Sequence, residues 1–224
     1  CDISDEAVNL RWLEYFKSRG TAAFLADSRS GNGFSALMPA VDAVLKEKFE
    51  RDRSRGIQRS SVRMMVVGIP NVGKSSFINR LASGHSAKTG DRPGVTTAKQ
   101  WIRISGKYEL LDTPGMLWPK FDSPDAGRKI AFTGGIKDEI MDIEELAYFL
   151  IGFLKKNYPE RLIERYKLSE SDLNEDDWDI VIKIGKKRGC IISGGETDTH
   201  RASALILDEF RSAKLGRISL ETPE

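Results

Sequence analysis

The stretch Gly68–Ser75 has the sequence GIPNVGKS, which fits the phosphate-loop pattern G-x-x-x-x-G-K-[ST]. The run before it, residues 62–67, is short, apolar and β-prone and predicts a strand. The residues after it carry Phe77, Ile78 and Leu81 at helical spacing. Because the motif requires a strand, a loop and a helix in this order, the sequence predicts a site for the phosphates of a nucleotide.

The residue types of this loop suit phosphate chemistry. Gly68 and Gly73 let the backbone turn so that successive N–H groups point at phosphate oxygens. The helix N-terminus adds a partial positive charge, Lys74 adds a full one, and the Ser75 hydroxyl can hold Mg²⁺. A chance glycine-rich turn is the alternative for the octet taken alone. The loop residues that we expect at the nucleotide are Asn71, Val72, Gly73, Lys74, Ser75 and Ser76.

A second motif, DTPG at residues 112–115, follows the predicted strand 108–111. An acid at the end of a strand is needed there, because Walker-B carboxylates bind the same Mg²⁺ through its water shell. We therefore expect Asp112 at the metal. Gly115 leaves a backbone N–H that can meet the γ-phosphate.

Between these motifs lies the stretch 90–97, GDRPGVTT, which is too rich in glycine and proline for a helix or a strand. Its composition predicts a mobile switch. We assign Thr96 to Mg²⁺ and the γ-phosphate, although the adjacent Thr97 fits the same role. Each motif taken singly is compatible with a surface turn, but the three in order favour a nucleotide switch.

The order of the remaining motifs narrows the family. In Ras-like GTPases the guanine-reading elements, N-K-x-D and an S-A-K-like loop, follow DxxG, yet nothing after Gly115 resembles either. Here Cys1-Asp2 is similar to the last half of N-K-x-D, and the stretch 27–33, DSRSGNG, is similar to the S-A-K-type loop. This order indicates a circular permutation. The chain resembles the YlqF/RbgA family of circularly permuted GTPases over essentially its whole length, including the stretches TGDRPGVTT, LLDTPGMLWPKF, NYPERL, KKRG and GRIS.

The resemblance implies a fold and a function. The expected fold is α/β, with a circularly permuted Ras-like P-loop GTPase domain at residues 1–125 and a small all-α C-terminal domain at 126–224 that contacts rRNA. The implied function is a GTPase switch in late assembly of the large ribosomal subunit, with GTP and GDP, the large subunit and its rRNA as partners and no membrane or DNA. The implied compartment is the cytoplasm, or the mitochondrion for a eukaryotic source.

Further site residues follow from the same resemblance. Asp2 is expected to accept hydrogen bonds from guanine, and Asp27 and Ser28 to lie at the base, with the Ser28 N–H meeting the guanine oxygen. The Asn and Lys of N-K-x-D, and two strands before them, are expected upstream of Cys1. Residues 1–224 alone are therefore expected to bind GTP weakly or to complete their sheet from another chain.

The catalytic group is not assigned. Met116 follows DTPG where a Ras-like enzyme has the glutamine that orients the attacking water, and a thioether cannot do this. Asn71 resembles the asparagine of potassium-activated GTPases, which makes K⁺ a candidate cofactor beside Mg²⁺; a loop-stabilising asparagine is the alternative. A GTP-binding scaffold with negligible turnover, a P-loop kinase and a GTPase acting in tRNA modification are the rival functions.

Composition and charge agree with an intracellular enzyme. The chain has 224 residues, 40% of them hydrophobic, and no apolar run approaches the roughly 18 residues of a membrane span. Two cysteines give no disulfide framework, and neither histidine has a ligand-spaced neighbour. Residues 1–129 carry a net charge of +7 and residues 130–224 one of −5, with an arginine cluster in the linker 51–63. The candidate RNA contacts of the C-terminal domain are Lys183, Lys186, Lys187, Arg188, Arg211, Lys214 and Arg217.

The spacing of apolar and capping residues also predicts helices and strands. Ser4 can cap a helix that continues to about Arg19, and a second helix is expected over 34–49. Two strands joined at 105–106 predict a hairpin. No strand pattern is clear after about residue 125, and helices are expected near 142–156, 159–166, 176–188 and 198–213.

Overall fold

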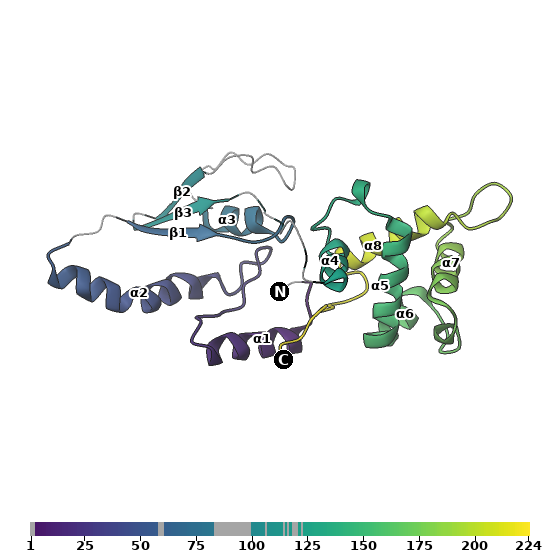
Figure 1. Ribbon diagram of the computed structural model, residues 1–224, viewed down its shortest axis with the longest axis horizontal. Helices are drawn as coiled ribbons and strands as arrows, with labels where there is room; N and C mark the ends of the chain where they lie inside the picture. The colour runs from purple at the N-terminus through teal and green to yellow at the C-terminus, as the bar shows by residue number, and fades with distance from the viewer. Residues whose placement is uncertain are drawn as a thin grey trace. The chain divides into compact units, whose positions relative to one another are not determined.

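The chain divides into two compact units in a computed structural model (Figure 1). Unit 1 comprises Cys1–Leu117 and Glu221–Glu224, and unit 2 comprises Trp118–Leu220. The structure describes residues 3–57, 61–82, 100–105, 107–113, 115, 117, 121 and 123–224. Within these residues, no helix combines the length and the apolar character that crossing a lipid bilayer demands.

Unit 1 contains a three-stranded sheet formed by β1 (Val62–Val66), β2 (Gln100–Ser105) and β3 (Tyr108–Asp112) in the order β1-β3-β2. β3 pairs antiparallel with β2, which confirms the predicted hairpin, and parallel with β1. Helix α3 (Lys74–Ala82) packs on β2 and β3 and buries Ile78 and Ala82. The parallel register places Val66 opposite Asp112, so the two strands end together beside the start of α3.

Two further helices of unit 1 differ from their predicted bounds. α1 (Glu6–Ser18) is capped by Asp5, whose carboxylate accepts from two first-turn N–H groups, whereas the Ser4 hydroxyl donates to Asn9. A 3₁₀ turn, η1 (Phe34–Ala36), precedes α2 (Leu37–Ser54).

α2 therefore continues past residue 49, and Arg51 and Arg53 lie in its last turn instead of in a linker. Basic side chains are favourable there because they face the negative end of the helix dipole. Arg63, the last arginine of the cluster, lies within β1 and donates to Glu109 on β3 at 3.2 Å.

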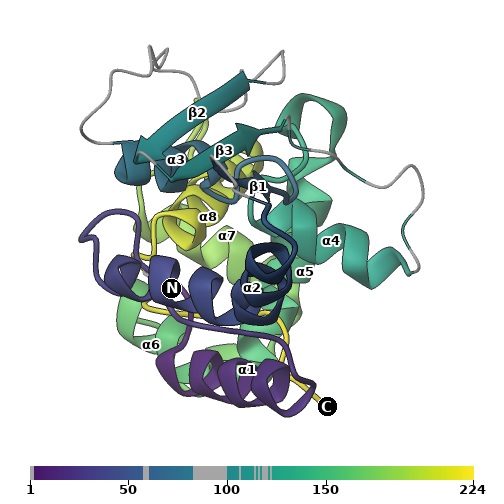
Figure 2. The ribbon, with the colours of Figure 1, turned by 90° about the vertical axis from the view of Figure 1, so that its left-hand side faces the viewer.

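The described residues of unit 2 form helices and one isolated bridge, Ile191 to Thr197. The helices are α4 (Pro124–Phe132), α5 (Ile143–Asn157), α6 (Pro159–Tyr166), α7 (Asp177–Lys187) and α8 (Thr199–Arg211), with short 3₁₀ turns η2 (Asp138–Ile140) and η3 (Asp172–Asn174). The four predicted C-terminal helices are confirmed as α5 to α8. Leu150, Ile180 and Ile206 are fully buried where α5, α7 and α8 lie side by side (Figures 1 and 2).

The division between the units falls at residues 117/118, not at 125/126 as expected. The reason is α4, which the sequence did not indicate: Ser123 caps it, and Ala131 and Phe132 join the core of unit 2. The last four residues rejoin unit 1, where Trp12 Nε1 donates to the Glu221 carbonyl at 3.3 Å.

Candidate functional site: a phosphate loop beside a guanine-type loop

The phosphate loop connects the end of β1 to the start of α3, as its sequence predicts. Asn71 and Gly73 have φ angles of 60° and 91°, in the left-handed region that glycine adopts freely and asparagine tolerates. The Gly73 carbonyl accepts from the Phe77 N–H at 2.9 Å, which continues the helical pattern from the loop into α3. The loop thereby turns sharply just before the N-terminus of a helix, the geometry that binds phosphate groups.

The Lys74 ammonium lies over this loop. Its Nζ donates to the Gly68 carbonyl at 3.0 Å and to the Ile69 carbonyl at 2.7 Å. Burial lowers the pKa of Lys74, while the charge of Asp112 acts in the opposite direction. The cation is thus partly desolvated and held by neutral acceptors, for which a phosphate oxygen is a stronger replacement.

Thr113 and Gly115 of the DTPG motif lie against the loop. Thr113 is buried, and its Oγ1 donates to the Val66 carbonyl at 2.6 Å, which fixes the chain at the end of β3. A Cβ atom on Gly115 would lie 2.8 Å from the Pro70 Cα and 2.9 Å from the Lys74 Nζ. Only a glycine permits this close approach, so the structure brings Lys74, Asp112 and Gly115 together.

The oxygen donors at this point suit Mg²⁺. Ser75 lies in the first turn of α3, and Asp112 ends β3 beside β1. A hydroxyl and a carboxylate are hard ligands, and Mg²⁺ is usually held by one or two protein oxygens with phosphates and water. Within the part of the chain that the structure describes, no group of three His, Cys, Asp or Glu residues could hold a metal without such help.

The loop at residues 27–33 is closed by Asp27. One carboxylate oxygen accepts from the Arg29 N–H at 2.8 Å and the other from the Ser30 hydroxyl at 2.6 Å. The Ser30 hydroxyl and then the Arg29 N–H lower the pKa of Asp27, so it is a carboxylate at neutral pH. The Ser28 N–H has no acceptor among the described residues and can meet a ligand oxygen. Asp27 thus shapes the loop, and Ser28 offers the donor.

Two contacts connect this loop to α3. Arg80 Nη2 donates to the Ser30 carbonyl at 2.7 Å, and a Cβ atom on Gly31 would lie 1.9 Å from the same nitrogen. Beside them, the rings of Phe34 and Phe77 lie 5.0 Å apart between centroids. One helix therefore carries the phosphate-loop lysine at its start and positions the 27–33 loop near its end. Nothing in the local sequence pattern indicates this role of Arg80, because its partner is a backbone carbonyl 50 residues away.

Several predicted site residues lie outside the described residues. They are Asp2, Thr96 with its neighbour Thr97, and Met116, the residue at the glutamine position of Ras-like enzymes. Val72 and Ser76 are exposed in the phosphate loop and the first turn of α3.

Family comparison connects this geometry to known proteins. Residues 63–183 match the family model described as 50S ribosome-binding GTPase. The chain is 46% identical over 223 residues to ribosome biogenesis GTPase A of Bacillus cereus, which covers 100% of the chain and 75% of the relative. It is 31% identical to the protein of the same name from Thermotoga maritima, over 100% of the chain and 74% of the relative.

Solved structures agree in fold. YlqF from T. maritima, in a GNP-bound crystal structure, superimposes with a TM-score of 0.64 at 26% identity and covers 100% of this chain and 78% of that one. A GDP-bound structure of YlqF gives a TM-score of 0.66 at 24% identity, over 99% and 80% of the two chains.

Proposed function

The chain belongs to the ribosome biogenesis GTPase A family, and from this premise we propose that it is a GTP-driven switch in late assembly of the large ribosomal subunit. The observation that carries the proposal is the meeting of Lys74, Asp112 and Gly115 at the ends of two parallel strands. In a phosphate-driven switch, γ-phosphate contacts order the loops and are lost on hydrolysis. Gly115 is suited to report that loss, because it already touches the loop that holds the phosphates.

Magnesium is the expected cofactor. Ser75 and Asp112 would hold it from the described part of the site, and Thr96 would add a hydroxyl. Bound Mg²⁺ neutralises charge on the β- and γ-phosphates. Lys74 complements the metal by binding the same phosphates from the loop side, and α3 contributes the N–H groups of its first turn.

Guanine selection is assigned to the 27–33 loop with Asp2, in the circularly permuted order. The support is structural: the loop is pre-shaped by Asp27, presents the Ser28 N–H, and is fastened to the phosphate-loop helix through Arg80. The Ser28 N–H would donate to the guanine oxygen, and Asp2 would accept from the ring N–H and the amine.

A monovalent cation is the proposed aid to hydrolysis, since Met116 cannot orient water. Asn71 has left-handed backbone angles in the phosphate loop and is exposed. Its side-chain oxygen would share a K⁺ ion with the phosphates. Hydrolysis should then be faster in potassium than in sodium at equal ionic strength, and the difference should vanish in Asn71→Ala.

The partners that we assign are GTP, GDP, and the large ribosomal subunit with its rRNA, the last through unit 2. The relatives named above are bacterial, which favours the cytoplasm as the compartment. A role on tRNA is the weaker alternative, because the matching family model carries the 50S ribosome in its description.

Multiple-turnover GTP hydrolysis with and without purified large subunits tests this function. We expect slow turnover by the protein alone and stimulation by large subunits, with little effect from small subunits or tRNA. Hydrolysis that never exceeds one turnover would favour a GTP-binding scaffold. Stimulation by tRNA alone would favour the tRNA reading.

A further inference from the structure

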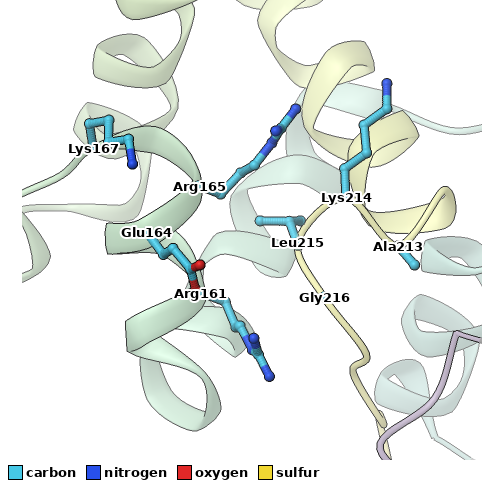
Figure 3. Close-up of a pocket in the computed structure, with 8 residues that line it drawn as sticks. All are labelled: Arg161, Glu164, Arg165, Lys167, Ala213, Lys214, Leu215 and Gly216. Atoms are coloured by element: carbon cyan, nitrogen blue, oxygen red, sulfur yellow. The ribbon is translucent and has the colours of Figure 1, made fainter.

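Unit 2 contains a basic hollow of about 430 Å³ between α6 and the turn that follows α8. Figure 3 shows α6 on one side and the 213–216 segment on the other, with Arg161 and Glu164 reaching from the helix toward the turn. The lining residues are Arg161, Glu164, Arg165, Lys167, Ala213, Lys214, Leu215 and Gly216. None of the residues assigned to the nucleotide is among them.

The basic residues of α7 and α8 are largely committed to holding unit 2 together. Lys183 pairs with Asp172 at 2.6 Å and Glu175 at 2.5 Å. Lys187 Nζ donates to the carbonyl of Lys167, the cap residue of α6, and Arg188 donates to the Arg165 carbonyl in the last turn of that helix. Arg211 binds Asp138 through two nitrogens and also donates to the Phe132 carbonyl. The positive run on α7 is therefore mainly a set of caps and ion pairs.

The charges of the hollow are much less compensated. In the described residues, no carboxylate lies within 4.0 Å of Lys167 or Lys214, and Arg161 has only Glu160, at 3.9 Å. Arg165 is neutralised by Glu209, with contacts of 2.5 and 3.0 Å. Glu164 supplies one opposing charge in the lining. The hollow thus retains a net positive charge after its internal pairs are subtracted.

The backbone turns where each helix beside the hollow ends. Lys167, the cap residue of α6, and Ala213, just past the end of α8, have φ angles of 56° and 57°. A left-handed residue commonly closes a helix C-terminus, and these two turns set the position of the Lys167 and Lys214 side chains. A Cβ atom on Gly216 would lie 3.0 Å from the Arg161 guanidinium, so that group rests against the turn, and Leu215 is buried behind it.

We propose that this hollow binds the phosphodiester backbone of RNA and is the main RNA anchor of unit 2. The inference rests on the proposed role in ribosome assembly, in which the polyanion that the protein contacts is RNA. The nitrogen ends of Arg161, Lys167 and Lys214 point in different directions (Figure 3), so they cannot converge on one small anion. Successive phosphates of a nucleic-acid strand can meet them one by one.

Binding of a fluorescent 20-base-pair RNA duplex to the full chain, measured by anisotropy at several salt concentrations, tests the site. Lys167→Gln and Lys214→Gln should each weaken binding about fivefold to tenfold at 0.1 M salt and reduce the salt slope by about one. Glu164→Gln should strengthen binding. Lys156→Gln is the matched control, because Lys156 is an exposed lysine of unit 2, in the last turn of α5 and outside the hollow. Thermal unfolding of each variant checks that the fold is retained.

The outcomes separate the rival ligands. A loss of affinity in Lys156→Gln equal to those in Lys167→Gln and Lys214→Gln, or no RNA binding by the unchanged chain, would overturn the proposal. So would displacement of RNA by equimolar tripolyphosphate or by a polyglutamate of equal charge, which would indicate a small-anion or acidic-peptide site. Large-subunit sedimentation is measured in parallel. If the protein binds the large subunit but the hollow variants keep full RNA affinity, only this inference fails. If RNA binding depends on the hollow but the protein does not bind the large subunit, the proposed function fails.

Discussion

We expect nucleotide binding to depend most on Lys74. Its ammonium is held by the Gly68 and Ile69 carbonyls and is partly desolvated, so little reorganisation is needed when phosphate replaces them. The sequence alone predicts this lysine as a phosphate ligand, because the octet fits the phosphate-loop pattern. It could not show the two carbonyl contacts, which depend on the exact turn of the loop.

We predict that Lys74→Ala abolishes measurable GTP binding, because the charge-assisted bonds to the β- and γ-phosphates are lost. Ser75→Ala should retain binding in EDTA but lose the gain that Mg²⁺ confers. Calorimetry with GDP and a GTP analogue, with and without Mg²⁺, gives both results, and Lys46→Ala on α2 serves as control. Near-normal affinity in both site variants would remove the phosphate-loop assignment.

Glu209 plays a structural part that the sequence did not reveal. It is 6% exposed and pairs with Arg165 and Arg188. Burial raises its pKa, but the Arg165 hydrogen bonds and the two positive charges outweigh burial, and the pKa is lowered overall. A carboxylate with a lowered pKa stabilises the fold above its ordinary pKa, and this contribution is lost as the pH falls through the folded value.

Glu209→Gln should therefore destabilise unit 2 by about 2 kcal/mol at pH 7, because a partly buried arginine loses its partner. The difference should shrink as the pH falls below about 4. Hydrogen exchange of the α8 amides reports the effect locally, and Glu196→Gln, at an exposed position, is the control. If the free-energy difference between the variant and the unchanged protein is the same at pH 7 and pH 3, Glu209 is not the ionised group that we assign.

At the scale of elements, α3 connects the phosphate loop to the 27–33 loop. The phosphate loop leads into its start, and Arg80 near its end holds the Ser30 carbonyl. Hydrophobic spacing was enough to predict α3 and the four helices of the C-terminal half. The sequence did not predict α4, because the helix is short and Gly127 lowers its helical propensity. Its Ser123 cap, Pro124 at the first helical position and the packed Ala131 and Phe132 compensate.

Arg80→Ala should weaken GDP binding about tenfold by releasing the 27–33 loop, with Arg80→Lys partly restoring it. Binding of tripolyphosphate, which has no base, should not change. Arg53→Ala, at an exposed position of α2, controls for the lost charge. Equal losses for GDP and tripolyphosphate would mean that Arg80 supports the whole fold and does not position the base-reading loop.

At the scale of the whole molecule, the net charge of each half of the chain does not show where its unpaired charges lie. Residues 130–224 have a net charge of −5, yet the basic side chains at Arg161, Lys167 and Lys214 gather in one hollow of unit 2. Many of the acidic residues are used in pairs, such as Asp172 and Glu175 with Lys183. Which charges cancel depends on tertiary contacts, so net charge alone misjudges where an RNA can bind.

The central claim is that nucleotide state controls association with the large ribosomal subunit. Co-sedimentation of the protein with large subunits under a non-hydrolysable GTP analogue and under GDP tests it directly. We predict that the protein pellets with subunits under the analogue and stays mostly in the supernatant under GDP, and that Lys74→Ala removes this difference. Equal pelleting in both nucleotides, or no pelleting in either, would contradict the claim.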